Sequence, residues 1–280
     1  MSHTRGGWTA ALVLLLAGCA VGAPSAPKSN AQPPTLTPAP LIAEDRVATP
    51  ERIDGTFNLH RPAQPVMAAS FRADLVADHC TDRDLPAPPV ADDALAVLDR
   101  SYSLPVGYAP QDLVAASAAG LSGPSGMKLL RAVVVDDLAA MAVAWEAAGL
   151  TVILESAYRS QVSQAATFDG WVARVGYAEA LTRTARPGHS EHQLGTAVDL
   201  TSPGWSGRFG DWAVESDEGA WMAAHGWEFG FVMSYPAGSQ DGTCFSYEPW
   251  HYRWIGREAA AAHRGSELDL RRFLERYVGA

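Results

Sequence analysis

Two histidines and an aspartate in this chain carry the donor atoms that a metal site requires. His192 and Asp199 are separated by six residues in "SEHQLGTAVDL", and His251 lies further along the chain in "EPWHYRW". Zinc prefers imidazole nitrogen and carboxylate oxygen, and a catalytic zinc site has three protein ligands and water in the fourth position. These three residues therefore predict a catalytic zinc site. Glu248, three residues before His251, is the candidate general base that acts on this water.

Each of these residues also has an ordinary structural interpretation. A lone histidine near a strand is more often a core or surface residue, and an aspartate at a strand end more often forms a turn. Glu191 is a competing candidate for the base, but on a strand or extended loop its side chain would point away from the metal. His189 and His225 are either partners of the ligands or surface residues. Only the combination of residues favours a metal site.

The elements that must position these residues can be read from hydrophobic spacing. Segment 129–150 is predicted to be an amphipathic helix with Gly149 as its C-terminal cap. Its apolar residues at helical spacing are Val134, Leu138, Met141 and Trp145. Segment 150–156, which is β-branched and short, predicts a buried strand. In the strand predicted at 195–200, Asp199 faces away from its two apolar neighbours.

The remaining segments predict helices and strands without regular alternation. The predicted helices are 161–176 (capped by Ser160), 177–185, 217–227 (capped by Ser216), 258–265 and 267–278, and the further strands are 229–236 and 249–256. This order favours an α+β fold with a small antiparallel sheet and flanking helices over a doubly wound parallel sheet.

The first residues have the features of an export signal. A positive start at Arg5 precedes the apolar run "WTAALVLLLAG", which is too short to span a bilayer comfortably. The following "LAGC" resembles the lipobox of bacterial lipoproteins, which implies that residues 1–19 are a lipoprotein signal peptide and that Cys19 is lipidated. The alternative is a secretory signal that ends in a chance cysteine. We expect an exported protein, anchored by lipid to the outer face of the cell membrane.

A tether and an extension follow the predicted signal. Residues 20–50 are rich in proline, alanine and serine, as in "APSAPKSNAQPPTLTPAPL", and cannot bury enough apolar surface to offset their ordering entropy. Residues 51–94 form an N-terminal extension. The formal charge of -10, without basic runs, argues against nucleic acid as a partner, because such binding depends mostly on phosphate neutralisation.

Cys80 and Cys244 remain once Cys19 is assigned to lipid. Two cysteines in an exported protein suggest one disulfide, and the alternative is two buried free thiols. A bridge would staple the N-terminal extension to the chain near Glu248.

The motifs together resemble the VanY-type D-alanyl-D-alanine carboxypeptidases, zinc peptidases of the bacterial cell wall. The family patterns S-x-H-x-x-G-x-A-x-D and E-x-W-H are matched by Ser190, His192, Gly195, Ala197, Asp199, Glu248, Trp250 and His251. "SAYRSQVSQAATF" is similar to the family's Y-R-S…Q…F segment, and "GYAPQDLV" is similar to an earlier family stretch. The resemblance covers about residues 95–275 and implies a zinc peptidase domain at 95–280 with a hedgehog/D,D-peptidase-like fold.

The resemblance also implies roles for single residues. It makes His192, Asp199 and His251 the zinc ligands and Glu248 the general base. Arg159 would contact the substrate near its carboxylate or the developing oxyanion, since a guanidinium matches carboxylate geometry. The resemblance further carries over Ser190 as a substrate contact, and Gln164 is either a substrate contact or a packing residue at the edge of the core.

The implied activity is removal of the C-terminal D-alanine from peptidoglycan stem peptides. The same family includes L,D-carboxypeptidases and peptidoglycan endopeptidases, and the zinc residues do not distinguish these activities. The alternative from another class is a cell-wall-binding lipoprotein that uses the fold without turnover. This alternative is disfavoured because all three ligands and Glu248 are present, whereas a protein without turnover usually lacks one of them.

Overall fold

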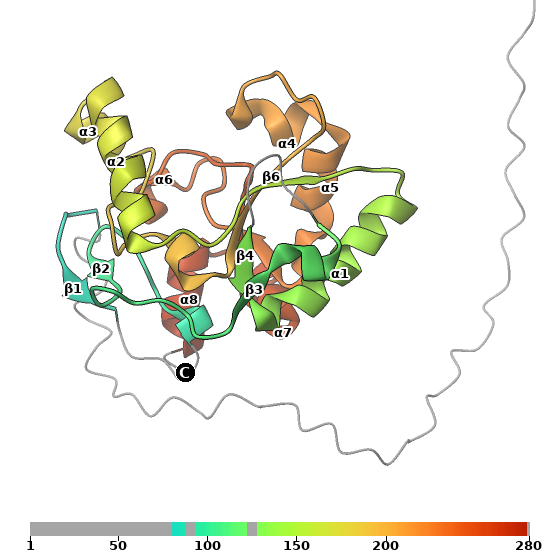
Figure 1. Cartoon of the computed structure of the whole chain (residues 1–280), viewed down its shortest axis with the longest axis horizontal. Helices are drawn as coiled ribbons and strands as arrows, with labels where there is room; N and C mark the ends of the chain where they lie inside the picture. The colour runs from blue at the N-terminus through green and yellow to red at the C-terminus, as the bar shows by residue number, and fades with distance from the viewer. Residues whose placement is uncertain (1–79, 88–92, 122–127, 279–280) are drawn as a thin grey trace, which may run out of the picture. The chain divides into compact units, whose positions relative to one another are not determined.

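The computed structural model describes residues 80–87, 93–121 and 128–278 (Figure 1). All of them belong to one compact unit, Asn58–Ala280. The predicted signal peptide with Cys19, the tether and most of the extension lie outside the described residues. Within the described part, no helix has the length and apolar character needed to cross a membrane.

A four-stranded antiparallel sheet forms the centre of this unit. Its strands are β5 (Ile153–Ser156), β6 (Ala197–Thr201), β8 (His251–Trp254) and β7 (Phe231–Met233), in that spatial order. The prediction of a small antiparallel sheet is therefore confirmed. The pairing of β6 with β8 places Asp199 directly opposite His251, although the two residues are distant in sequence.

Two short ladders flank the central sheet. β3 (Leu113–Ala115) pairs antiparallel with β4 (Leu129–Arg131), and β1 (Leu85–Pro86) pairs parallel with β2 (Tyr102–Ser103). The β4 strand corrects the predicted start of the first helix at residue 129. Residues 129–131 give their backbone hydrogen bonds to β3, so the helix begins three residues later than its apolar spacing suggests.

Helix α1 (Ala132–Ala147) covers one face of the sheet. Its buried residues are those predicted from the helical spacing, Val134, Leu138, Met141 and Trp145. They pack in one apolar cluster with Leu154 on β5 and with Val198 and Leu200 on β6. Gly149, just beyond the helix, has a φ of +74°, which explains why glycine is required there. Because Val198 and Leu200 face α1, Asp199 between them faces the opposite side of the sheet.

A helix on that opposite side builds one wall of the pocket around Asp199. α2 (Gln161–Val175) begins at Ser160, whose hydroxyl accepts a hydrogen bond from the Ser163 backbone at 3.2 Å, so the predicted cap is confirmed. α3 (Tyr177–Ala180) is a single turn, shorter than predicted, and continues as a series of turns. In Figure 1, α2 and α3 lie on one side of β6 and α4 (Trp212–Glu215) and α5 (Asp217–His225) lie on the other.

The helices that follow β6 in the chain complete the fold. Ser216 caps α5 by accepting a hydrogen bond from the Gly219 backbone at 2.9 Å, as predicted. A short helix, α6 (Gln240–Thr243), precedes β8. α7 (Arg257–Arg264) and α8 (Leu270–Val278) correspond to the two predicted closing helices, and they form a second apolar cluster with β7.

A disulfide joins Cys80 to Cys244 across 164 residues of sequence, which confirms the predicted bridge. Polar contacts hold the same segment in place, because Asp84 accepts a hydrogen bond from Arg186 at 2.7 Å and lies 3.0 Å from His189 Nε2. The end of the extension is thus attached to the chain a few residues before Glu248.

The double variant Cys80→Ser/Cys244→Ser is expected to lower the free energy of unfolding, by at most about 5 kcal/mol in the chain-entropy treatment of so long a loop. Urea unfolding of the oxidised protein and of the variant measures this difference. The reduced wild-type protein is the matched control and is expected to unfold at the midpoint of the variant. Equal midpoints for all three samples would contradict the prediction.

Candidate metal centre

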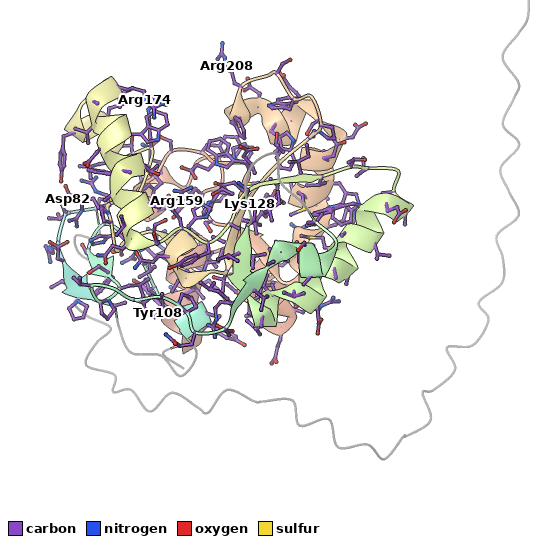
Figure 2. The ribbon with its side chains drawn as sticks, in the orientation of Figure 1. Asp82, Tyr108, Lys128, Arg159, Arg174 and Arg208 are labelled. Carbon is purple, nitrogen blue, oxygen red and sulfur yellow. A yellow bond between two sulfur atoms is a disulfide. The ribbon has the colours of Figure 1, made fainter. Side chains whose placement is uncertain are left out.

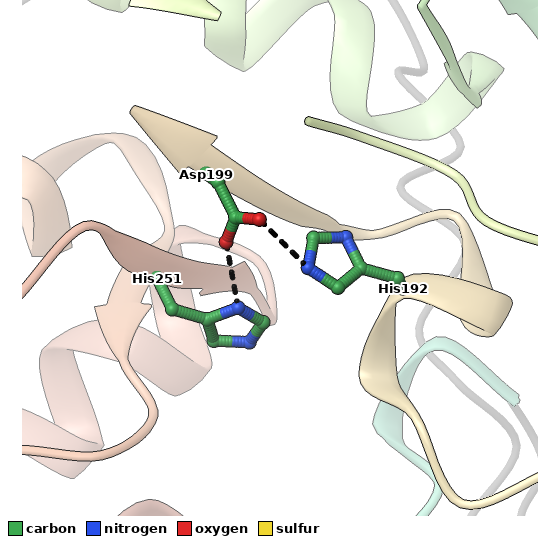
Figure 3. A group of neighbouring side chains, drawn as sticks. All are labelled: His192, Asp199 and His251. Atoms are coloured by element: carbon green, nitrogen blue, oxygen red, sulfur yellow. Dashed lines mark hydrogen bonds and ion pairs between the residues drawn. The ribbon is translucent and has the colours of Figure 1, made fainter. Parts of the chain in front are cut away.

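The structure brings the three predicted ligands together (Figure 3). His192 comes from a 3₁₀ turn, Asp199 from β6 and His251 from β8, and their ligand atoms all lie within 4.8 Å of one another. Asp199 lies between the two imidazoles, with Oδ2 at 3.2 Å from His192 Nε2 and Oδ1 at 3.0 Å from His251 Nδ1. This group has the donor atoms of a three-ligand zinc site.

A tight turn delivers His192 to this position. The segment Glu191–Leu194 is a 3₁₀ helix, which corrects the expected strand or extended loop. It ends at Gly195, whose φ is +73°, and a Cβ there would lie 3.0 Å from the side chains of Arg131 and Leu113. The requirement for a glycine is thus both conformational and steric. The turn allows the chain to reverse between His192 and β6.

The second nitrogen of each imidazole is occupied, and this fixes which nitrogen faces Asp199. His192 Nδ1 donates to the Ala157 carbonyl at 2.7 Å, which leaves Nε2 as the free donor atom. His251 Nε2 lies 3.0 Å from Glu191 Oε2, which leaves Nδ1 for a metal. Metal-binding histidines in proteins are typically held in this way by a carbonyl or a carboxylate. The residues present therefore fit a bound zinc ion.

Glu191 is a buried positioning residue behind His251. Besides His251, it accepts a hydrogen bond from Ser234 at 2.6 Å and forms an ion pair with Arg253 at 2.9 Å. Its carboxylate contacts His251 Nε2, whereas Nδ1 of the same ring faces Asp199, and the turn that brings Glu191 there was not predicted. Burial alone would raise the pKa of Glu191, but Arg253 and His251 lower it to about 2.

Arg253 was missed by the reasoning from sequence. Its side chain is fully buried on β8, and Nη2 donates to the carbonyls of Ala94 and Ala96 at 2.7 Å each. The signal was present in "HYRWI", because residues two apart on a strand face the same side, and an arginine within an apolar strand needs a buried counter-charge. The partner, Glu191, could not be identified without the fold.

Electrostatics of the three ligands favour a cation at their meeting point. Burial alone would raise the pKa of Asp199, but the two neighbouring imidazoles hold it well below its usual range. Burial alone would lower the pKa of His251, but hydrogen bonds to Asp199 and Glu191 raise it to about 10. In the metal-free protein a proton on His251 therefore supplies the positive charge, and binding of a metal displaces that proton.

Glu248 faces the same position from the turn before β8. The His251 backbone donates to the Glu248 carbonyl at 3.1 Å, and this turn places both side chains on one side of the chain. Glu248 Oε2 lies 4.0 Å from His251 Nδ1. Burial raises the pKa of Glu248 to about 8. The carboxyl thus lies close to the three candidate ligands and outside their group, and its role as general base stays a prediction.

Arg159 lies just before the start of α2, where Figure 2 labels it, and beside the ligand Asp199. Its backbone donates to the His192 carbonyl at 3.1 Å, and Nη2 lies 3.8 Å from Asp199 Oδ2 and donates to Ser156 Oγ at 3.1 Å. Nη1 donates to Gln164 Oε1 at 2.9 Å. The guanidinium is therefore held in one orientation beside the metal ligands.

Gln164 lies behind Arg159 and does not reach the surface of the pocket. Its side chain is fully buried, and its amide nitrogen donates to Thr184 Oγ1 at 3.2 Å and to the Ala185 carbonyl at 2.7 Å. The structure thus gives Gln164 a positioning contact with Arg159, and its direct contact with a substrate stays a prediction.

A pocket of about 180 Å³ opens over these groups. Its walls include the three ligands, Arg159, Glu248 and Ser190. The two histidines left undecided lie outside it. His189 is buried against the Asp99 carbonyl at 2.7 Å, and His225 pairs with Glu228 on the surface.

Known proteins are similar to this chain over much of its described length. Residues 127–257 match the VanY family, described as D-alanyl-D-alanine carboxypeptidase. The Bacillus subtilis protein YodJ is 31% identical over 183 residues, which are 65% of this chain and 67% of YodJ. The chain belongs to the VanY family. A D-alanyl-D-alanine carboxypeptidase of Enterococcus faecalis is 37% identical to this VanY-family chain over 132 residues, 43% of this chain and 47% of that protein.

Solved structures confirm the predicted fold class for this VanY-family chain. The LdcB LD-carboxypeptidase superposes with a TM-score of 0.59 at 31% identity, over 66% of this chain and 86% of LdcB. A variant of the vancomycin-resistance D,D-pentapeptidase VanY, in complex with Zn(II), gives 0.54 at 29% identity, over 65% of this chain and 98% of that chain. VanYB in complex with D-Alanine-D-Alanine gives the same TM-score and identity, over 65% of this chain and 97% of that chain.

Proposed function

We propose that this protein is a zinc-dependent carboxypeptidase that removes the C-terminal D-alanine from peptidoglycan stem peptides. The observation that carries the proposal is the donor set His192, Asp199 and His251, in which each imidazole presents its free nitrogen toward Asp199. Similar solved structures contain Zn(II) or D-Alanine-D-Alanine, which supports both the metal and the substrate class.

His192, Asp199 and His251 would hold the metal. When bound, zinc supplies a Lewis acid that lowers the pKa of water and polarises the scissile carbonyl. Glu248 accepts a proton from the attacking water and then donates it to the nitrogen of the leaving D-alanine. Glu248 is largely buried in the pocket wall, which limits its contact with bulk solvent between the two transfers.

Arg159 binds the carboxylate at the C-terminus of the substrate. A guanidinium donates two parallel hydrogen bonds to a carboxylate, and its fixed orientation beside Asp199 places that carboxylate next to the reacting carbonyl. Ser190, which is 4% exposed and lines the pocket, adds a polar contact to the substrate.

The decisive experiment is to incubate the purified protein with a stem pentapeptide ending in D-Ala-D-Ala, with zinc and with a chelator, and to analyse the products by mass spectrometry. Loss of one alanine that stops with chelator and returns with zinc is expected. An intact pentapeptide would contradict D,D-carboxypeptidase activity.

Two further substrates separate the alternatives. Cleavage of a tetrapeptide ending in D-alanine would identify an L,D-carboxypeptidase, an activity named for the similar LdcB structure, and cleavage of cross-linked stems would identify an endopeptidase. If all these peptides stayed intact with zinc bound, the protein would be a non-catalytic cell-wall-binding lipoprotein. In each case, export and lipidation at Cys19 would hold the protein at the outer face of the membrane, close to peptidoglycan.

The variant Gln164→Leu is expected to raise KM about tenfold and to change kcat little. It removes the acceptor that orients Arg159, and a charge-assisted hydrogen bond contributes about 1.5–3 kcal/mol. Steady-state kinetics on the cleaved peptide measure the effect. Gln161→Leu is the matched control, since it makes the same change on the same helix outside the pocket, and it is expected to leave KM unchanged. Equal KM values for both variants would refute the positioning role.

A further inference from the structure

The pocket continues beyond the metal ligands along one face of α2. Thr167 and Trp171 on this helix and Arg183 in the turns after α3 line it together with the three ligands and Arg159. The cavity, of about 180 Å³, thus extends from the ligands to this helix face, so a bound substrate can contact the face with residues that precede its last alanine.

The length of α2 indicates which part of a peptide reaches this wall. Figure 2 shows Arg159 at one end of the helix and Arg174 at the other. A helix rises about 1.5 Å per residue, so Thr167 and Trp171 lie roughly 10 Å and 16 Å beyond Ser160 along its axis. An extended peptide spans about 3.3 Å per residue. A substrate with its C-terminal residue at Arg159 reaches the level of Thr167 about three residues earlier, so its fourth residue from that end meets this wall, and a long side chain on the third residue can extend to it.

Arg183 has the chemistry to bind an anion there. Its guanidinium lies 5.7 Å from the centre of the Trp171 ring, which holds it at the wall. Nε and Nη2 both donate to one oxygen of Glu179, at 2.8 Å and 2.6 Å. Within the described residues Nη1 makes no hydrogen bond. The ion pair is about half exposed, and such i,i+4 pairs contribute little, so a substrate carboxylate can share or replace Glu179.

The distribution of charge in the pocket leaves this role to Arg183. Among the described residues that line it, Arg159 and Arg183 are the two that carry a guanidinium. Arg159 is held beside the metal ligands, where the C-terminal carboxylate binds. A second carboxylate further along the substrate would meet Arg183.

We propose that Arg183, held against Trp171, binds a second carboxylate of the substrate, located two or three residues before the C-terminal residue. This inference rests on the proposed function and names its substrate class more closely. In stem pentapeptides, that carboxylate belongs either to a diaminopimelate-type residue at the third position or to the γ-linked D-glutamate at the second. The enzyme then prefers stems in which this carboxylate is free over stems in which it is amidated.

The test compares kcat/KM for three pentapeptides of nearly equal size. The first carries both free carboxylates, the second has an amidated diaminopimelate, and the third has D-isoglutamine. For the wild-type protein, one of the two amidations is expected to lower kcat/KM about tenfold or more, and the amidated residue that does so identifies the source of the carboxylate. Arg183→Gln is expected to remove this preference, whereas Arg183→Lys, which keeps the charge, retains part of it.

Arg174→Gln is the matched control. Arg174 also stacks on Trp171, at 4.9 Å from the ring centre, but does not line the pocket, so this variant is expected to keep the preference of the wild-type protein. Equal kcat/KM for all three peptides in the wild-type protein, or an unchanged preference in Arg183→Gln, would overturn the inference and leave the proposed function intact. Failure of the wild-type protein to cleave any of the peptides would instead overturn the proposed function itself.

Discussion

Replacing Glu248 with glutamine is expected to lower kcat by about 10³-fold or more while zinc stays bound. General acid–base catalysis contributes about 10² to 10⁴ in rate, and here one carboxyl serves as both base and acid. Glutamine preserves the shape of the side chain but cannot accept the proton. Glu248 lies outside the group of three ligand side chains, so its loss leaves the donor set complete. Turnover of the stem peptide and zinc content per protein measure the two effects.

The same variant tests the electrostatic environment of Glu248. Its pKa in the folded metal-free protein, about 8, lies above the ordinary value of 4.5, so the folded state binds a proton that the unfolded state has lost between these pH values. The stability contributed by this group therefore falls as the pH rises from about 4.5 to 8. The stability of metal-free Glu248→Gln should decline less over this window in urea unfolding.

Glu228→Gln on the surface is the control for both measurements with the Glu248 variant. It makes the same chemical change at a side chain that is 45% exposed, and it is expected to leave kcat and zinc content unchanged. Full peptidase activity of Glu248→Gln would show that the base has been assigned to the wrong residue. Loss of zinc from the variant would show instead that Glu248 is a ligand.

Replacing Glu191 with glutamine is expected to destabilise the protein by about 3–5 kcal/mol, since removal of one partner leaves the charge of a fully buried arginine uncompensated. The change also weakens the hold on His251 Nε2, and loss of such a partner typically lowers metal affinity about 10- to 100-fold. Urea unfolding measures the stability, and competition with a chelator of known affinity measures zinc binding.

A double-mutant cycle with Arg253→Met separates the two effects of the Glu191 change. The double variant removes both charges and is expected to recover part of the stability lost in Glu191→Gln, because no unpaired charge remains. Its zinc affinity should stay low, because His251 still lacks the carboxylate. If zinc affinity were the same in the wild-type protein and in Glu191→Gln, Glu191 would be a purely structural residue.

Local rules accounted for much of the fold. The apolar spacing in α1, the serine caps of α2 and α5 and the glycine after α1 each depend on residues within a few positions of one another. The start of α1 was placed three residues too early because β4 competes for the same backbone groups, and its partner β3 lies on the other side of a connecting segment. Helical spacing contains no information about such a partner.

The sequence by itself determined which residues are candidates for the chemistry. His192, Asp199, His251 and Glu248 lie in short motifs whose combination resembles that of the VanY family, so these candidates could be named before their positions were known. The pairing of Cys80 with Cys244 could be proposed by elimination and was confirmed by the structure.

Only the tertiary structure decided how these residues are held. The register of β6 against β8 sets Asp199 opposite His251, and the 3₁₀ turn directs Glu191 toward His251 and Arg253. Gln164 became a partner of Arg159 for the same reason. Orientation depends on which distant segments supply the second hydrogen-bonding partner of each polar group, and a buried group takes the partner that the packed fold brings within reach.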